Sequence, residues 1–213
     1  RELWNGPKTH DAFSRFDMLE RKVDEAEGRA EALGLGHAVL CAREVIGDEP
    51  FAVLLPDELM VGRPNFTAQM VEAYNQVGGN VIGALEVADE ETSKYGIISP
   101  GKVEGRLTEV TALVEKPAKG TSPSNLMIPG RYILQPEVMR ILDRKEKGAG
   151  GEIQLTDAMA QLIGEQPFHG FTFDGERYDC GDKAGFIQAN LALALARDDI
   201  GPAVRSFAET LLR

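Results

Sequence analysis

Cysteine and histidine are scarce in this chain, which has 2 cysteines and 3 histidines among its 213 residues. Cys41 and Cys180 lie far apart, and neither has a histidine or a second cysteine at metal-ligand spacing. The sequence therefore predicts neither a zinc site nor a disulfide framework, and we expect both cysteines to be small buried residues. A G-x-S-x-G motif and a Walker phosphate loop are also absent, and the histidines show no partner pattern for nucleophilic catalysis.

Basic residues are outnumbered, because 23 lysines and arginines stand against 34 aspartates and glutamates, for a formal net charge of -11. A general nucleic-acid binder needs a basic surface, so this class is excluded and any phosphate site must be local. The sequence has no apolar run of membrane-spanning length and no signal peptide, so we expect a cytoplasmic protein without a membrane partner. A chain of this length, with a hydrophobic content of 43%, can bury the core of one α/β domain.

Asp57 is the most informative residue that is present. It follows Phe51-Ala52-Val53-Leu54-Leu55-Pro56, an apolar run typical of a strand buried on both faces of a parallel sheet. Ligands of such sheets collect at the carboxyl ends of the strands, and a buried unpaired carboxylate there would be costly. Asp179 follows a second strand-like run, and two converging carboxylates are typical of Mg²⁺ sites that handle phosphates. A turn or helix-capping role for Asp57 remains the alternative.

Helical and strand patterns alternate along most of the chain and predict an α/β fold with a Rossmann-like, mostly parallel central sheet flanked by helices. Residues 1–30 are anomalous, and we interpret them as an irregular or helical segment, possibly discontinuous, before a domain at 31–213 that ends in helices. The turn signal Asp174-Gly175 predicts a hairpin at 168–180. The remaining elements are expected as helices at about 34–45, 66–77, 136–144, 155–164, 183–197 and 202–212, and as strands at 51–55, 80–87, 95–99, 106–115 and 126–134.

A set of ordered motifs carries a more specific resemblance, which extends from about residue 33 to about residue 197. The motifs are Leu33-Gly34-Leu35-Gly36-His37-Ala38, Leu55-Pro56-Asp57, Tyr95-Gly96-Ile97, Val114-Glu115-Lys116-Pro117, Ser124-Asn125-Leu126, Gly130-Arg131-Tyr132, Gly150-Gly151-Glu152-Ile153-Gln154-Leu155-Thr156-Asp157 and Tyr178-Asp179-Cys180-Gly181-Asp182-Lys183. In this order and spacing the chain resembles the bacterial UTP:glucose-1-phosphate uridylyltransferases of the sugar-nucleotidyltransferase family.

The resemblance implies a Mg²⁺-assisted transfer of UMP from UTP to glucose 1-phosphate, which gives UDP-glucose and pyrophosphate. We expect a homodimer or homotetramer, with the last two helices as its interface. It implies that Asp57 and Asp179 hold Mg²⁺ and that Lys116 offsets charge on the phosphates. Glu115 and Asn125 match positions that bind glucose hydroxyls.

Three glycines are candidates for positions beside the substrates, one from the resemblance and two from the physics of a helix start. The Gly96 backbone matches the position that lies against the sugar ring. Gly34 and Gly36 open a helix whose free N–H groups could hold a nucleotide base or a phosphate, although both could simply start the helix.

Two features of the family are missing from this sequence. The family's first strand, with its Gly-x-Gly-Thr-Arg loop around the triphosphate, has no counterpart, and neither does its Lys-Glu-Met motif. Arg29 stands where the family places a uracil-reading glutamine. We interpret the chain as lacking residues that the full polypeptide has, including N-terminal strands, and we therefore expect either a break within about the first 30 residues or an open sheet edge beside the strand at 51–55.

Three functions stay open on the sequence alone. The first is the uridylyltransferase reaction. The second is a related nucleotidyltransferase with another nucleotide or sugar, which Arg29 makes possible. The third is a non-catalytic subunit that binds a sugar nucleotide, which the missing loop favours.

Overall fold

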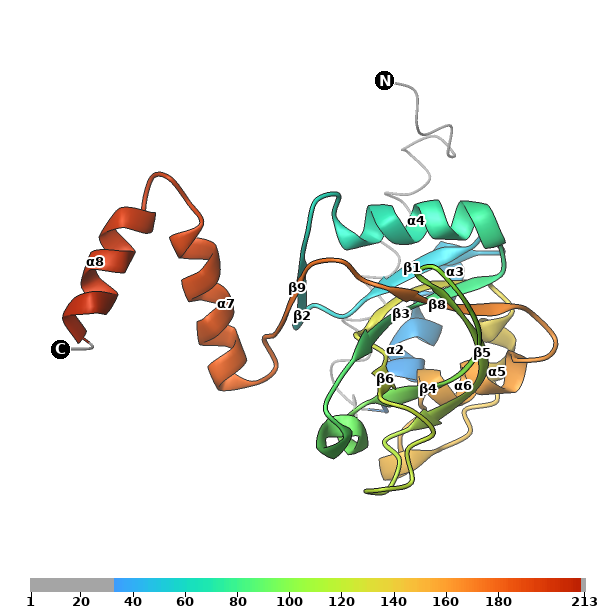
Figure 1. Ribbon diagram of the computed structural model, residues 1–213. Helices are drawn as coiled ribbons and strands as arrows, with labels where there is room; N and C mark the ends of the chain where they lie inside the picture. Colours follow the sequence, from blue (N-terminus) through green and yellow to red (C-terminus); the bar gives the residue numbers. More distant parts are fainter. Residues whose placement is uncertain (1–32, 212–213) are drawn as a thin grey trace.

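A central sheet lies between helices in the computed structural model, which describes residues 33–211 (Figure 1). The segment expected at 1–30, with Arg29, lies outside the described residues. The helices are α2 (Leu35–Cys41), α3 (Arg43–Ile46), α4 (Phe66–Val77), η1 (Asp89–Lys94), α5 (Val138–Leu142), η2 (Ala149–Gly151), α6 (Leu155–Leu162), α7 (Lys183–Leu195) and α8 (Gly201–Leu211). The strands are β1 (Phe51–Leu54), β2 (Glu58–Val61), β3 (Asn80–Glu86), β4 (Gly96–Glu104), β5 (Leu107–Glu115), β6 (Leu126–Met127), β7 (Arg131–Leu134), β8 (Phe168–Thr172) and β9 (Glu176–Asp179).

Two separate sheets carry these strands. The main sheet has the order β1-β7-β3-β6-β4-β5-β8, with an additional pairing of β8 to β3, and β2 pairs with β9 in a small ribbon of its own. Among the described residues β1 pairs only with β7, so it forms an edge of the main sheet, as the sequence predicted. Leu54 on this edge strand is 49% exposed.

The α/β class with a central sheet between helices is confirmed, but the predicted predominance of parallel strands is wrong for the described residues. Of their pairings, β3 with β8 is parallel, and the others, including β1 with β7 and β4 with β5, are antiparallel. The apolar strand patterns misled the prediction because helices on both faces bury a strand whichever way its neighbours run. Short connections such as the one between β4 and β5 also permit only antiparallel neighbours.

The predicted hairpin at 168–180 is wrong as well. Its two halves form strands, but β8 joins the main sheet while β9 pairs with β2. Aromatic packing accounts for the difference, because Phe171 and Phe173 lie 6.2 and 4.6 Å, centroid to centroid, from the ring of Phe66 on α4. Burial of these rings holds β8 under α4, and the chain leaves the main sheet before the turn.

The core has two layers, one on each face of the main sheet. On one face α4 supplies Phe66 and Met70, which cluster with Val81 of β3. On the other face α2, α5 and α6 cover Ile82 and its neighbours. Val81 and Ile82 point to opposite layers because side chains alternate along a strand. This packing fixes the strand ends from which the site residues project.

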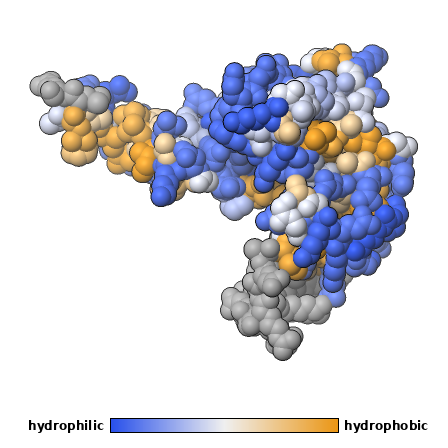
Figure 2. All heavy atoms as spheres, turned by 90° about the horizontal axis from the view of Figure 1, so that it is seen from below, coloured by the Kyte–Doolittle hydropathy of each residue, from blue (hydrophilic) through white to orange (hydrophobic). Residues whose placement is uncertain are grey.

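Helices α7 and α8 project away from the body of the molecule (Figure 1). They carry exposed apolar side chains, which Figure 2 shows as a hydrophobic surface on the projecting part. The largest exposed fractions belong to Ile187 (62%), Phe207 (65%) and Leu211 (69%). Within residues 33–211, no helix is both long and apolar enough to cross a membrane.

Both cysteines are free thiols and are more accessible than we expected. Cys41 ends α2 on its exposed side, and Cys180 is half-buried after β9. The backbone explains the place of Cys180, because its N–H donates to the carbonyl of Asp57 at 2.7 Å. This bond ties the ends of β2 and β9 together.

Candidate active site

Asp57 and Asp179 meet at one end of the β2–β9 ribbon. Asp57 immediately precedes β2, Asp179 ends β9, and Glu58 is the register partner of Asp179. A Cβ placed on Gly181 would lie 3.0 Å from Asp57 Oδ2 and 3.2 Å from Asp179 Oδ1, so the two oxygens are no further apart than these distances combined. The convergence predicted from the sequence is therefore present in the fold.

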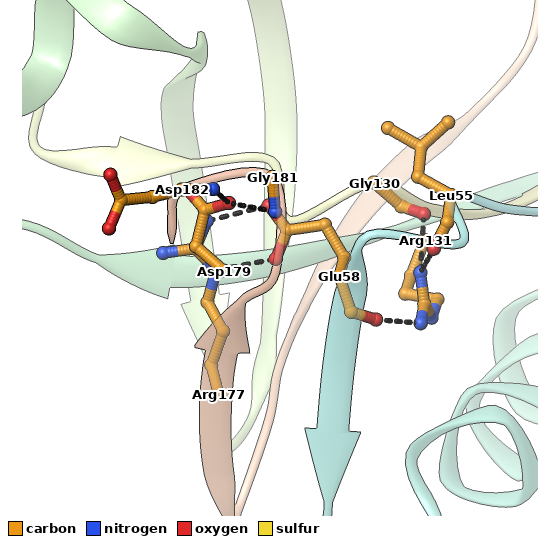
Figure 3. A network of polar contacts seen from close by, with 8 residues as sticks. All are labelled: Leu55, Glu58, Gly130, Arg131, Arg177, Asp179, Gly181 and Asp182. Carbon is orange, nitrogen blue, oxygen red and sulfur yellow. Dashed lines mark hydrogen bonds and ion pairs between the residues drawn. The ribbon is translucent and has the colours of Figure 1, made fainter. Parts of the chain in front are cut away.

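Backbone donors fix the carboxylate of Asp179. Its Oδ1 accepts from the N–H of Gly181 at 3.0 Å and of Asp182 at 3.3 Å (Figure 3). Asp182 itself caps α7, since its carboxylate accepts from the N–H of Gly185 at 2.9 Å. Asp57 is exposed. The ion pairs of Arg177 are with Asp179 and Glu58.

The donor set suits a hard cation that also carries substrate oxygens. Mg²⁺ is commonly held by one or two carboxylates together with phosphates and water. Within residues 33–211, no group of three or more His, Cys, Asp and Glu side chains could hold a metal ion. A cation at Asp57 and Asp179 would thus draw its remaining ligands from a bound phosphate and from water.

A cavity of about 240 Å³ lies where β1, β5 and β6 end and where β4 and β7 begin, beside the loop before α6. Gly96 and the pair Glu115-Lys116 line it, and they come from the start of β4 and the end of β5, where Gly96 and Glu115 are register partners. The other lining residues are Leu35, Leu55, Glu58, Lys94, Tyr95, Ile128, Gly130, Tyr132, Glu152, Gln154, Leu155 and Thr156. Three of the predicted site residues are thereby brought together.

Two polar side-chain atoms border the space above Gly96. A Cβ on Gly96 would lie 3.1 Å from Glu115 Oε2 and 3.2 Å from Thr156 Oγ1. A carboxylate and a hydroxyl thus converge over a bare backbone, an arrangement that offers paired hydrogen bonds to a ligand hydroxyl. Burial raises the pKa of Tyr132, also in the wall, so its phenol stays neutral and can donate.

Lys116 adopts a backbone conformation that lysine disfavours, with φ at 44°. Its N–H donates to the carbonyl of Tyr95 at 3.0 Å, which secures the turn. The ammonium lies 3.9 Å from Glu115 Oε1, and the side chain is 54% exposed. Non-glycine residues in this region cluster at functional sites, and the loosely paired ammonium is free to meet an anion.

The other predicted site residues do not line this cavity. Asn125 immediately precedes β6, and its backbone carbonyl accepts from the N–H of Val87 at 3.0 Å. Gly34 caps α2 and Gly36 lies in its first turn, where its N–H donates to the carbonyl of Ile153 at 2.9 Å. The structure gives both glycines a packing role beside the cavity, and Leu35 between them contributes to its wall.

Several cavity residues were not singled out from the sequence. Thr156 and Glu152 belong to a motif that we quoted, but carboxylates and hydroxyls in a glycine-rich loop are usually structural. Lys94 lies just before the Tyr95-Gly96 motif and lines the same cavity. Lys94 donates a hydrogen bond to the carboxylate of Glu91, and this bond together with the negative charge of Glu91 raises the pKa of Lys94, so a second ammonium lies in the cavity wall. From the sequence, these residues could have been found only because they lie in or next to the motifs that carry the resemblance.

A family model described as nucleotidyl transferase matches residues 12–195. The chain is similar to UTP--glucose-1-phosphate uridylyltransferase of Bacillus subtilis (strain 168), at 47% identity over 206 residues, which cover 93% of this chain and 70% of that protein. It belongs to the nucleotidyl transferase family. A protein of the same name from Komagataeibacter xylinus is 51% identical over 154 residues, which cover 72% of this chain and 54% of that relative's length.

Solved structures support the same placement. A UDP-glucose pyrophosphorylase complexed with UDP-glucose aligns with a TM-score of 0.76 at 39% identity, covering 79% of this chain and 65% of that chain. The nucleotidyltransferase fold expected from the sequence motifs is therefore confirmed.

The helix start at Gly36 yields a stability prediction. A Cβ there would lie 2.7 Å from the carbonyl oxygen of Ile153 and 2.8 Å from Leu142 Cδ2. A backbone oxygen cannot move aside as the end of a flexible side chain can, so Gly36→Ala should lower the free energy of unfolding by about 1–3 kcal/mol. Urea denaturation of the two proteins would measure this, and an unchanged midpoint would show that α2 is free to shift from the 152–153 segment.

Proposed function

We propose that this chain carries the catalytic domain of a UTP:glucose-1-phosphate uridylyltransferase, which transfers UMP from UTP to glucose 1-phosphate and releases UDP-glucose and pyrophosphate. The observation that carries the proposal is the meeting of Asp57 and Asp179 across Gly181, beside a cavity lined by Gly96, Glu115 and Lys116. The names of the Bacillus and Komagataeibacter relatives support it.

The reaction needs no general base. The second pKa of a phosphate monoester is about 6, so glucose 1-phosphate is mostly dianionic near neutral pH. One of its oxygens forms a bond to the α-phosphorus of UTP while the bond from that phosphorus to the β-phosphate oxygen breaks, and pyrophosphate leaves with the electron pair. The work left to the protein is to position the two substrates and to neutralise their charge.

Each site residue has a task in this scheme. Asp57 and Asp179 would hold Mg²⁺, which when bound neutralises charge on the α-phosphate and the sugar phosphate. Lys116 places its ammonium against the phosphates from the cavity wall. Glu115 accepts hydrogen bonds from glucose hydroxyls above Gly96, with Thr156 beside it.

The proposal extends to self-association. The exposed apolar side chains of α7 and α8 support pairing between copies of the chain as a homodimer or homotetramer, because an apolar surface of this kind is typical of interfaces. The cytoplasmic location stays a prediction from the sequence.

Turnover with different nucleotides tests the proposed function and separates it from its alternatives. The full-length polypeptide, supplied with glucose 1-phosphate and Mg²⁺, should form UDP-glucose from UTP faster than it uses dTTP, CTP or GTP. A preference for another nucleotide would indicate the related nucleotidyltransferase. Binding of UDP-glucose without Mg²⁺-dependent release of pyrophosphate would indicate the non-catalytic subunit.

The sugar site gives a second test. Glu115→Ala should raise the KM for glucose 1-phosphate about 10- to 100-fold, because a hydrogen bond to a charged group is worth about 1.5–3 kcal/mol. The Mg²⁺ requirement should not change. Glu104→Ala, at the far end of the β4–β5 pair, is a matched control that should leave the KM unaltered. If Glu115→Ala bound glucose 1-phosphate as tightly as the wild type, Glu115 would have another role.

A further inference from the structure

The two carboxylates proposed to hold the cation do not belong to the sheet that forms the sugar cavity. Asp57 and Asp179 lie at the end of the β2–β9 ribbon, which is a sheet of its own, whereas Gly96, Glu115 and Lys116 belong to the main sheet. Nucleotidyl transfer needs these two groups in a fixed relation, because small misplacements of reacting groups are costly. The contacts that join the ribbon to the main sheet therefore matter for the chemistry.

Arg177 of β9 makes a set of contacts at this junction. Its Nε donates to Glu58 Oε2 at 2.6 Å and its Nη2 to Glu58 Oε1 at 2.6 Å. The same Nη2 lies 3.5 Å from Asp179 Oδ2. Its guanidinium carbon also lies 5.2 Å from the centroid of the Tyr95 ring, and Tyr95 accepts the backbone N–H of Lys116. One side chain thus contacts both strands of the ribbon and the corner of the main sheet that carries Lys116.

The contacts with Arg177 keep the carboxylate of Glu58 from binding a cation. Only 8% of Glu58 is exposed, and both of its carboxylate oxygens are engaged by Arg177. Glu58 follows Asp57 directly, so without Arg177 a third, uncompensated carboxylate would stand beside Asp57 and Asp179. Leaving a buried charge of this kind unpaired is strongly unfavourable.

A second arginine anchors the same ribbon from the main sheet. Arg131 of β7 donates through Nη1 to the carbonyl of Leu55 at 2.8 Å and through Nη2 to the carbonyl of Glu58 (Figure 3). These bonds hold the backbone of β2, whereas the contacts of Arg177 reach side chains of the candidate metal site. The two arginines therefore have separate tasks, and only Arg177 contacts a carboxylate proposed to bind the cation.

We propose that Arg177 is a positioning residue for nucleotidyl transfer. It orients the carboxylate of Asp179 and fixes it relative to the Tyr95–Lys116 corner, while it keeps Glu58 from competing for the cation. This inference rests on the proposed function, because it assigns a task to Arg177 in that same site. It predicts that geometry at the metal carboxylates depends on a side chain that contacts neither substrate.

Two variants separate positioning from folding. Arg177→Lys keeps the charge, but a single ammonium cannot span Glu58 and Asp179 as a planar guanidinium does. The double variant Glu58→Met/Arg177→Met removes an acid and a base together, so the net charge near the site is unchanged and no unpaired charge stays buried; such replacements of a buried pair are often neutral for stability. Arg106→Met is the matched control, because Arg106 also lies over an aromatic ring, that of Phe171. Arg106 immediately precedes β5 and is therefore at the opposite end of that strand from Glu115.

The measurements are Mg²⁺-dependent formation of UDP-glucose, Mn²⁺ binding followed by electron paramagnetic resonance without nucleotide, and thermal unfolding, all on the full-length polypeptide. In both Arg177 variants the Mg²⁺ concentration for half-maximal rate and the Mn²⁺ dissociation constant should rise about tenfold, within the range that a displacement of about 1 Å in the site can cause. The double variant and Arg106→Met should melt close to the wild type, and Arg106→Met should bind Mn²⁺ normally.

A double variant that is folded and keeps the wild-type metal dependence would overturn the proposal and leave Arg177 a structural residue. If the double variant does not fold, Arg177→Lys decides by the same metal measurements. Failure of the proposed function has a different signature: wild-type protein that binds Mn²⁺ but forms no UDP-glucose. In that case weakened Mn²⁺ binding in the Arg177 variants would still support the positioning of Asp179.

Discussion

Asp57→Asn and Asp179→Asn should each reduce Mg²⁺-dependent formation of UDP-glucose by about a thousandfold, because a bound metal ion supplies several kcal/mol of charge stabilisation in the transition state and each 1.36 kcal/mol is a factor of ten. Asparagine is nearly isosteric, and at position 179 it can still accept from the N–H groups of Gly181 and Asp182. The fold should therefore survive both changes. Initial rates over a Mg²⁺ series, with thermal unfolding in parallel, would measure the effect.

Asp198→Asn is the matched control for these variants, since Asp198 is exposed between α7 and α8 and should tolerate the change. Higher Mg²⁺ should rescue neither site variant fully, because a lost ligand cannot be replaced by concentration alone. A strongly lowered melting temperature with normal activity of the remaining folded protein would contradict the metal assignment. It would show instead that the two carboxylates serve the turn after β9.

Lys116→Ala is expected to lower kcat by about 100- to 1,000-fold, the effect of removing one preorganised charge or donor from a transition state. The KM values should change less, because the charge on the phosphates is redistributed mainly as the bond to pyrophosphate breaks. The side chain is 54% exposed and loosely paired with Glu115, so its loss should not unfold the protein. Single-turnover rates at saturating substrates would isolate the chemical step.

Lys119→Ala removes an exposed lysine three residues further along and should leave the rate unchanged. Lys116→Arg keeps the charge and should recover part of the lost activity. If the alanine variant turned over at the wild-type rate, Lys94, which lines the same cavity, would be the next candidate for the ammonium that meets the phosphates.

The sequence predicted the convergence of two aspartates better than it predicted the strands that carry them. Asp57 and Asp179 were predicted to converge, and they do, because both follow strand-like runs and an acid after such a run has few packing roles. Their strands were assigned differently: β9 was expected to pair with β8, and it pairs with β2, which the sequence did not suggest. Strand partners depend on contacts between distant segments, such as Phe66 with Phe171 and Phe173, that local patterns do not contain.

The cavity shows a similar division. Gly96, Glu115 and Lys116 came from the resemblance, and the register of β4 with β5 brings them together. Thr156 could not be assigned in advance, because only the packing of α6 places its hydroxyl over Gly96. The pairing of Glu58 with Arg177 was equally hidden, since the two residues are separated by more than half of the chain and neither belongs to a pattern of charge spacing.

The left-handed backbone of Lys116 has a consequence for how the protein responds to heat. Such a conformation is disfavoured by about 1–3 kcal/mol for a residue other than glycine, and it persists only while its surroundings impose it. At Lys116 this contact is the hydrogen bond that its N–H donates to the carbonyl of Tyr95, immediately after the end of β5. Local opening of strand ends requires less free energy than global unfolding. If the proposed function holds, the ammonium of Lys116 would move away from the phosphates at a temperature where the sheet is still intact, and activity should be lost at a lower temperature than the fold.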